Sequence, residues 1–352
     1  MPISRGDITL HFGPQEQGGD DSLLDPIIAF IDTARRRQKL MIAVQEIDHP
    51  GIASAIVRAR QRGATVDVVI EQSYLLAQRM PADPTQPGGP HEINRQLQNM
   101  MLRATVDLKS DFNPSIFHQK FMVLGNRVLT GSTNFTTTGV TKNLNHIVEV
   151  NDAEIANQYK REFKEIQQGR FGKWSIDRDE KPKDSTVSGI RVKALFAPDH
   201  APEMEIMKQI LKAKDRIDFA VFTFAQSSGI DEALVAAADR GVQVSGVLDR
   251  RMGNQTWAAR DNLVAGGVEI RVAGNRGSLG KVHHKMMVID DQLSIFGSFN
   301  YTGPANLSND ENILVVGDLD EARATRRNTQ SALASAAREE IDRIWFDFGD
   351  AV

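Results

Sequence analysis

The chain has 352 residues and contains no cysteine. Disulfide bridges and metal sites built on thiolates are therefore excluded, and the composition fits a reducing compartment, so we expect a cytoplasmic protein. No apolar run approaches the ~20 residues that a membrane-spanning helix requires. The segment that begins at Met1 has no basic stretch followed by an apolar one, so we also expect no signal peptide.

The sequence lacks an excess of positive charge, since its formal net charge is −4. Overall electrostatic attraction would not steer such a chain to a polyanion, so binding of DNA or RNA would need a local basic patch. This argues against a purely electrostatic nucleic-acid binder, but not against a nuclease with a basic cleft. The length suffices for two domains with cores of their own.

A short set of polar residues occurs twice at nearly the same spacing. Each copy has a histidine, then a lysine on an apolar-alternating segment typical of a strand, and then a Gly-Ser-x-Asn. The two copies are His118, Lys120, Gly131, Ser132 and Asn134, and His283, Lys285, Gly297, Ser298 and Asn300. These residue types suit a phosphate group, because they supply a base or nucleophile, a fixed cation, backbone donors and an amide donor.

The two halves of the chain also align outside these sets. In each half a helix precedes a buried strand, and a second helix closed by a glycine precedes another strand. The segments are 24–34, 39–44, 52–62 and 66–70 in the first half, and 204–213, 216–221, 230–240 and 242–248 in the second. Helices that alternate with short apolar strands predict an α/β fold with a central mixed or parallel sheet.

Three segments between these elements are irregular in composition. Residues 177–188 are polar, rich in lysine and aspartate, and predict a linker between domains 1–176 and 189–352. Residues 80–91 are rich in proline and glycine, and are either a surface loop or a rim over the site. The corresponding segment of the second half, 273–281, is rich in glycine.

The repeated set resembles the His-x-Lys-x4-Asp motif, with its downstream Gly-Ser-x-Asn, of the phospholipase D superfamily. The second copy matches in full through Asp290, whereas Gly125 replaces the aspartate of the first copy. Both positions look like tight turns between strands, so we expect the motif aspartate to be structural. The resemblance covers both halves. It implies two pseudo-symmetric phospholipase D-like halves, each a mixed β-sheet flanked by helices, with one active site at their interface.

The resemblance also implies a phosphodiesterase mechanism without a metal or other cofactor. In this superfamily one motif histidine attacks phosphorus and forms a phosphohistidine, while the other protonates the leaving oxygen and then activates water. His118 and His283 would take these parts. The residues that would hold the non-bridging oxygens are Lys120, Lys285, Asn134 and Asn300. Ser132 and Ser298 would add hydroxyl or backbone donors, and His284 should face away from His283 on its strand.

One further position distinguishes the two histidines. Glu311 lies eleven residues after the motif asparagine of the second half, and Asn145 lies eleven residues after that of the first. In the family this position often bears a carboxylate or amide that orients a motif histidine. A carboxylate favours the protonated ring more than an amide does. We therefore expect His283, paired with Glu311, to be the general acid, and His118, paired with Asn145, to be the nucleophile.

Three functions are consistent with these residues. The leading one is a metal-independent endonuclease that cleaves DNA, or RNA, because both Gly-Ser-x-Asn segments look most like the nuclease branch. The candidates for contacts with a phosphate backbone are Arg250, Arg251, Arg276 and Lys281.

The second function is a phospholipase or phosphatidyl-transferase, which should offer an apolar entrance or an amphipathic surface helix. The sequence contains no helix with an evident cluster of exposed aromatic residues. The third is a catalytically weak scaffold that binds nucleic acid. Because one chain carries both motifs, a monomer can hold a complete site, while a homodimer or an unknown protein partner stays open.

Overall fold

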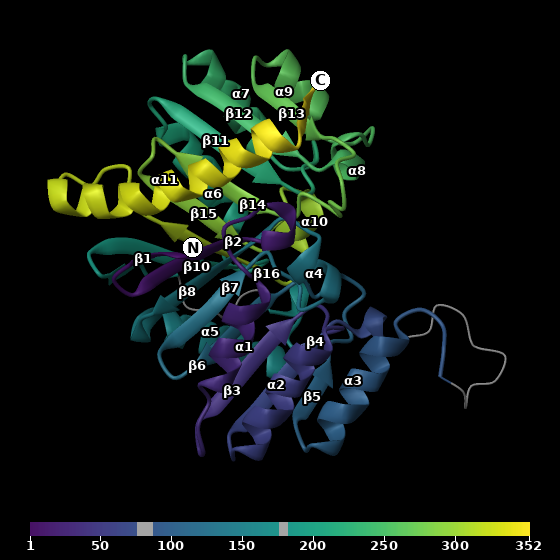
Figure 1. Cartoon of the computed structure of the whole chain (residues 1–352). Helices are drawn as coiled ribbons and strands as arrows, with labels where there is room; N and C mark the ends of the chain where they lie inside the picture. The colour runs from purple at the N-terminus through teal and green to yellow at the C-terminus, as the bar shows by residue number, and fades with distance from the viewer. Residues whose placement is uncertain (76–86, 176–181) are drawn as a thin grey trace.

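The structure is a computed structural model that describes residues 1–75, 87–175 and 182–352. Two mixed β-sheets with their helices follow one another along the chain, and in Figure 1 the first half lies below the second. This arrangement confirms the predicted α/β fold of two similar halves. The predicted loop at residues 80–91 lies mostly outside the described residues.

The first sheet combines a parallel part and an antiparallel part. Its strands are β1 (Ile3–Arg5), β2 (Ile8–Gly13), β3 (Lys39–Val44), β4 (Thr65–Ile70), β5 (Asp107–Ser110), β6 (Lys120–Leu124), β7 (Arg127–Gly131) and β8 (Asn145–Asn151). They lie in the order β1-β2-β8-β7-β6-β3-β4-β5. Strands β3, β4 and β5 are parallel, and the remaining neighbours pair antiparallel.

The second sheet repeats this order and adds a strand at one edge. Its strands are β9 (Ser185–Val187), β10 (Ile190–Ala197), β11 (Arg216–Val221), β12 (Gln243–Leu248), β13 (Glu269–Ala273), β14 (Lys285–Ile289), β15 (Leu293–Gly297), β16 (Glu311–Val316) and β17 (Gly349–Ala351). They lie in the order β17-β13-β12-β11-β14-β15-β16-β10-β9. Read from the opposite end, the order matches that of the first sheet, with β17 as the addition.

Strand β9 falls within the predicted linker, so that prediction was wrong for residues 185–187. The three residues pair antiparallel with β10 across a turn at Ser188 and Gly189. Both turn residues have positive φ values, of 47° and 86°, which close the short hairpin. The segment therefore extends the sheet instead of spanning between domains.

Helices cover both faces of each sheet. The helices of the first half are α1 (Leu24–Asp32), α2 (Pro50–Gln61), α3 (Glu92–Arg103), α4 (Thr137–Thr141) and α5 (Ala153–Gln167). Those of the second half are α6 (Pro202–Lys212), α7 (Ile230–Asp239), α8 (Arg250–Gly253), α9 (Arg260–Ala265), α10 (Gly303–Leu307) and α11 (Ala324–Asp347). Short 3₁₀ helices occupy residues 15–17, 72–74 and 172–174. Within the described ranges, no helix is long and apolar enough to cross a bilayer.

The two longest helices join the halves. Helix α5 packs on β6, β7 and β8 of the first sheet and contacts β10 of the second, while α11 packs on the second sheet and contacts β1 and β2 (Figure 1). A shared apolar core fills this region. At its centre Tyr159 lies edge-on to Phe121 and to Phe196, with ring centroids 5.0 Å and 4.9 Å apart. This common core fixes the orientation of the two halves, and hence of the site between them.

Candidate active site

The motif residues lie at one edge of each sheet. Strands β6 and β14 begin at Lys120 and Lys285, and the neighbouring strands β7 and β15 end at Gly131 and Gly297. Because each pair is antiparallel, the beginning of one strand lies beside the end of the next. Residues far apart in the motif are thereby brought together.

The motif glycines allow a close approach to the next strand. Gly131 and Gly297 have φ values of 148° and 149°. A Cβ atom on Gly131 would lie 2.3 Å from the carbonyl oxygen of His146, and one on Gly297 would lie 2.2 Å from that of Asn312. Any side chain at these positions would push the strands apart, which explains the glycine in both motifs.

The two sheet edges meet through the backbone of the motif histidines. The His118 N–H donates to the Asp310 carbonyl at 2.9 Å, and the His283 N–H donates to the Leu144 carbonyl at 2.9 Å. Each motif histidine is therefore anchored to the other half of the chain. The residue that follows each acceptor, Glu311 or Asn145, is thereby placed beside that histidine.

This anchoring makes the histidine pairs cross between the halves. His118 Nδ1 lies 2.7 Å from Glu311 Oε2, and His283 Nδ1 lies 2.9 Å from Asn145 Oδ1. The predicted pairing, His283 with Glu311 and His118 with Asn145, is wrong. The reason is the backbone contact between halves, which places each orienting side chain against the opposite motif.

Hydrogen bonds around Asn145 fix the tautomer of His283. The Asn145 Nδ2 group donates to the carbonyls of Gly139, at 2.9 Å, and Asn143, at 3.3 Å. Its Oδ1 atom accepts from the Ser132 hydroxyl at 2.8 Å and faces His283 Nδ1. Since Oδ1 only accepts, His283 carries its proton on Nδ1, and Nε2 of the neutral ring has a free lone pair.

Burial governs the ionisation of the second pair. Burial raises the pKa of Glu311 to about 8, against the favourable charges of Lys120 and Lys285. Burial, and next the charge of Lys120, holds the pKa of His118 well below its ordinary value. In the unliganded site the two groups therefore share one proton along their 2.7 Å contact.

Two buried lysines supply the cations of the site. Lys120 Nζ donates to the His118 carbonyl at 2.9 Å and to Gln45 Oε1 at 3.3 Å, and Lys285 Nζ donates to the His283 carbonyl at 2.8 Å. Burial lowers the pKa of Lys120 to about 7, and burial followed by the charge of Lys120 lowers the pKa of Lys285 well below its ordinary value. Burial thus disfavours charge on both lysines, and an entering anion would stabilise their protonated forms.

The motif asparagines and serines have different surroundings. Asn134 and Asn300 have amide oxygens that are buried without a partner among the described residues, so their amides are available to a substrate. The serines are not. Ser132 Oγ accepts from the His146 N–H at 3.0 Å and donates to Asn145. Ser298 Oγ accepts from the Asn312 N–H at 3.0 Å and hydrogen-bonds the Glu311 side chain.

The backbone N–H groups of Ser132 and Ser298 are engaged too, at 3.1 Å and 3.0 Å, by the carbonyls of His146 and Asn312. The prediction that the serines donate to phosphate is therefore wrong. The hydrogen-bonding groups of the serines are already engaged because each Gly-Ser segment pairs with the next strand. The serines instead hold the residues that orient the histidines.

Comparison with known proteins identifies the family of this chain. The family model described as "Cardiolipin synthase, PLD-like domain" matches this chain twice, at residues 27–167 and at residues 206–345. The chain belongs to the phospholipase D-like family. It is therefore a phosphodiesterase of the hydrolase type, with one family domain in each half.

Similar sequences match less than half of this chain, and a solved structure resembles all of it. A phospholipase D of Rickettsia bellii is 32% identical over 150 residues, covering 43% of this chain and 73% of that protein. A mitochondrial cardiolipin hydrolase of Xenopus laevis is 29% identical over 146 residues, 42% of this chain and 62% of that protein. The phosphatidylserine synthase of Haemophilus influenzae shares the fold of both halves, with a TM-score of 0.65 over all of this chain and 89% of that one, at 16% identity.

The family aspartate has a structural part in this phospholipase D-like chain. The Asp290 carboxylate accepts from the backbone N–H groups of Lys214, Asp215 and Arg216 at 2.9, 2.8 and 2.9 Å. It thus ties the turn between β14 and β15 to the start of β11, far from the histidine rings. The prediction of a structural aspartate is confirmed.

Of the four predicted substrate-binding cations, Lys281 reaches the site. Its Nζ atom lies 5.1 Å from the centre of the Phe222 ring. Arg276 instead forms an ion pair with Asp350, so its charge is already compensated. Arg250 and Arg251 are exposed at the start of α8, whose N-cap Asp249 also accepts from the Val282 N–H at 3.1 Å. These two arginines therefore lie on the segment beside Lys281.

Two residues that form the side walls of the site were not predicted from the sequence. In the second half, the Phe222 ring lies 4.8 Å from that of His283 and 5.0 Å from Lys285 Nζ. In the first half Gln45 contacts Lys120, and the neighbouring Glu46 accepts from Asn94 at 3.1 Å. Burial raises the pKa of Glu46 to about 7. Phe222 and Gln45 are the residues that follow β11 and β3, so alignment of the halves could have indicated both.

Proposed function

We propose that the protein is a metal-independent endonuclease, acting on DNA in preference to RNA, that works through a phosphohistidine intermediate. The observation that carries this proposal is the wall built by Phe222. Its ring lies against His283, Lys285 and Lys281, so an aromatic face and cations alternate beside the reacting histidine. Proteins bind single-stranded nucleic acid with this combination, because bases stack on rings while cations follow the phosphates.

A hollow of about 500 Å³ lies among residues that follow Phe222 and Asn300 in sequence. Its lining includes Thr223, next to Phe222 in sequence, and Thr302, two residues after the motif residue Asn300. Trp257 also lines the hollow and keeps 42% of its surface exposed. The volume suits a nucleotide-sized group. The Trp257 ring offers a second surface for stacking by a base next to the scissile phosphate.

In the proposed mechanism His118 is the nucleophile. Its Nε2 lone pair attacks phosphorus, forming the N–P bond as the bond to the leaving oxygen breaks. His283, neutral before the substrate binds, takes up a second proton on Nε2 when the anionic phosphate enters, and gives that proton to the leaving oxygen. The attack places a positive charge on the His118 ring, which the Glu311 carboxylate stabilises from Nδ1. Water then attacks phosphorus, its proton passes to His283 Nε2, and the N–P bond breaks, which restores both rings.

The remaining polar groups hold the phosphoryl oxygens. Lys120 and Lys285 approach from the two halves, and each retains donors that its carbonyl contact does not use. The unpartnered amides of Asn134 and Asn300 can turn their NH₂ groups to the same oxygens. Because negative charge spreads over these oxygens during displacement, the four donors act mainly on the transition state.

The test is cleavage of labelled single-stranded DNA, duplex DNA and RNA in excess EDTA. Wild-type protein would be compared with His118→Ala and His283→Ala. We expect cleavage of single strands that persists in chelator and is lost in both variants. Trp257→Ala is expected to weaken binding of single-stranded DNA about tenfold, by the loss of one stacked base. Phosphodiester hydrolysis without any nucleic-acid cleavage would overturn the assignment.

A second candidate is a lipid phosphodiesterase, which one feature of the site favours. Phe112 and Ile116 precede His118 and are 64% and 48% exposed, and Leu307 lies close before Asp310 with 61% exposed. These segments meet where Phe117 pairs with Asp310. They provide the apolar entrance that a lipid substrate needs. The test is release of the headgroup from cardiolipin or phosphatidylcholine vesicles. Lipid hydrolysis that is lost in Ile116→Ser, while DNA cleavage by the same variant is unchanged, would favour this function.

A further inference from the structure

A chain of buried imidazoles runs behind the Asn145–His283 pair and crosses between the halves. His146, next to Asn145, and His284, next to His283, have nearly parallel rings, at an interplanar angle of 12°, with centroids 5.4 Å apart and Nδ1 atoms 3.1 Å apart. His284 Nε2 continues the chain to Glu340 Oε1 at 3.3 Å. All three side chains are buried.

The neighbouring groups allow one arrangement of protons in this chain. The backbone N–H of Gly297 points at His146 Nε2, 3.1 Å away, so Nε2 accepts and the proton of His146 is on Nδ1. That proton faces His284 Nδ1, which must therefore accept. His284 then carries its proton on Nε2, directed at the Glu340 carboxylate. Both rings are neutral in this arrangement.

The chain reaches the catalytic histidine through Ser132. Its hydroxyl oxygen accepts from the His146 backbone N–H at 3.0 Å and lies 3.3 Å from His146 Nδ1. With donors on that side, the hydroxyl proton is directed to Asn145 Oδ1, 2.8 Å away. Asn145 Oδ1 is the atom that holds His283 Nδ1. A continuous series of polar contacts thus links Glu340 to His283.

The opposite side of the site has the same chain without imidazoles. Gln119 and Asn312 occupy the positions of His284 and His146, and Asn312 Nδ2 donates to Gln119 Oε1 at 2.7 Å. Gln119 Nε2 in turn donates to Glu162 Oε1 at 3.3 Å. The pseudo-symmetric counterparts are amides, so the fold needs a polar pair at this position but does not require histidines.

We propose that His146 and His284 are positioning residues for the phosphodiesterase reaction, which keep Ser132 and Asn145 oriented so that His283 presents Nε2 to the substrate. The rings achieve this with fixed, uncharged tautomers. If either were protonated further, two N–H groups would face each other in the chain. The proposal rests on the family reaction and not on the choice of nucleic acid as substrate.

The surroundings of the two rings favour the neutral form of both histidines. Burial, followed by the charges of His284 and Lys285, holds the pKa of His146 well below its ordinary value. Burial also lowers the pKa of His284, against the contact and charge of Glu340, while Arg343 and Lys285 act in the same direction as burial. Glu340 is itself compensated by two Arg343 contacts of 2.8 Å.

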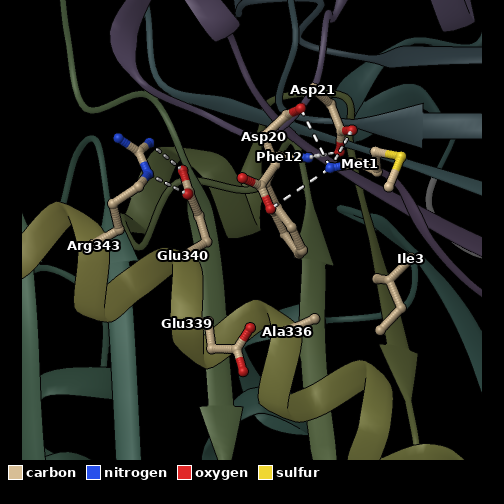
Figure 2. A pocket seen from close by; sticks show the side chains of 9 residues that line it. All are labelled: Met1, Ile3, Phe12, Asp20, Asp21, Ala336, Glu339, Glu340 and Arg343. Carbon is tan, nitrogen blue, oxygen red and sulfur yellow. Dashed lines mark hydrogen bonds and ion pairs between the residues drawn. The ribbon is translucent and has the colours of Figure 1, made fainter.

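The buried outer end of this series of contacts, Glu340, borders a pocket. Figure 2 shows Arg343 and Glu340 paired on α11, where they line a pocket of about 330 Å³ with the N-terminal segment. Arg343 also donates to the Gln17 carbonyl at 3.0 Å, a contact with the first half of the chain that fixes the guanidinium. The carboxylate is thereby held in place, so it offers His284 Nε2 a fixed acceptor.

The first experiment reads the tautomers directly, by ring nitrogen-15 NMR of histidine-labelled protein. We expect Nδ1-protonated rings for His146 and His283 and an Nε2-protonated ring for His284, assigned by removing each in turn. In His146→Phe, which keeps a ring but loses both nitrogens, the His283 signals should move toward a mixture of tautomers. A His283 spectrum identical to that of the wild type would overturn the proposal.

The second experiment follows hydrolysis of bis(p-nitrophenyl) phosphate. His146→Phe should lower kcat about tenfold with little change in KM, because alignment is lost and not substrate contact. The double variant His146→Asn/His284→Gln, which copies the amide pair of the other side, should recover most of kcat. His11→Gln is the matched control, since His11 forms an equally long 3.3 Å contact with Glu149 outside the chain. A loss of kcat in this control equal to that in His146→Phe would refute a positioning role. If the wild-type protein does not hydrolyse this ester, the NMR experiment alone tests the proposal.

Discussion

His118 and Glu311 come from different halves of the chain and share a 2.7 Å contact in the buried centre of the site. The equivalent contact on the other side joins His283 to an amide, Asn145. The two motif imidazoles therefore have chemically different partners, although the fold around them is nearly symmetric. A carboxylate stabilises a positively charged ring better than an amide does, which favours His118 as the histidine that carries the phosphoryl group.

Replacement of Glu311 by glutamine tests this difference. We expect kcat to fall about 100-fold, because the amide cannot stabilise the charge that develops on His118. Thermal stability should be unchanged or higher, since the variant removes a buried carboxyl whose pKa is raised to about 8. Loss of activity in parallel with unfolding would point instead to a purely structural carboxyl.

Trapping of the intermediate tests the assignment of the nucleophile independently. The reaction would be quenched without acid during turnover and analysed by peptide mass spectrometry. We expect the phosphoryl group on His118 in the wild-type protein and an unmodified His118 in Glu311→Gln. The stabilising carboxylate would also ease protonation of His118 in the free enzyme, which is the property of a general acid. A phosphoryl group on His283 would show that this second effect dominates and that the roles are reversed.

Anion binding should depend on pH through Lys120. Burial lowers its pKa to about 7, so the free site loses this cation as the pH rises through that value, and affinity for an anion should fall there. Sulfate is a suitable probe because its own charge does not change near neutrality. Calorimetry in Lys120→Arg should give a flatter profile, since guanidinium stays charged. An equal decline in both proteins would assign the effect to another group.

The sequence predicted the parts of this site that depend on local pattern. The strands beginning at Lys120 and Lys285, and the left-handed glycines Gly63 and Gly241 after α2 and α7, both with φ of 90°, follow from alternation and capping. The tight turn at Asp290 and the structural role of this aspartate were also predicted. These features involve neighbours along the chain or in one hairpin.

Contacts between the halves could not be predicted in the same way. Spacing placed Glu311 and Asn145 correctly on their strands, but it does not say which sheet edge lies opposite. The crossed pairing depends on the backbone contacts of His118 and His283 with the other half. Phe222 was missed because an aromatic residue after a buried strand has the same pattern as a core residue.

Stability should fall in acid because of the buried imidazole pair. The folded-state pKa values of His146 and His284 lie below that of an unfolded histidine, about 6.5, so the unfolded chain binds more protons below that pH. Each ring then lowers the unfolding free energy by up to about 1.4 kcal/mol per pH unit as the pH falls. Denaturant unfolding of His146→Asn/His284→Gln at pH 7 and pH 5 should show a smaller difference than the wild type, whereas His11→Gln should retain it.

Salt dependence separates the cation that faces the site from one that is already paired. Lys281 lies against Phe222 beside the reacting groups, whereas Arg276 is bound to Asp350. If the substrate is a nucleic acid, Lys281→Gln should reduce the slope of log affinity against log salt by about one, because one fewer phosphate counterion is released. Arg276→Gln removes the same charge and should leave the slope unchanged. Equal slopes for all three proteins would place the strand elsewhere on the surface, and the wall at Phe222 would then have to be assigned to a different substrate group.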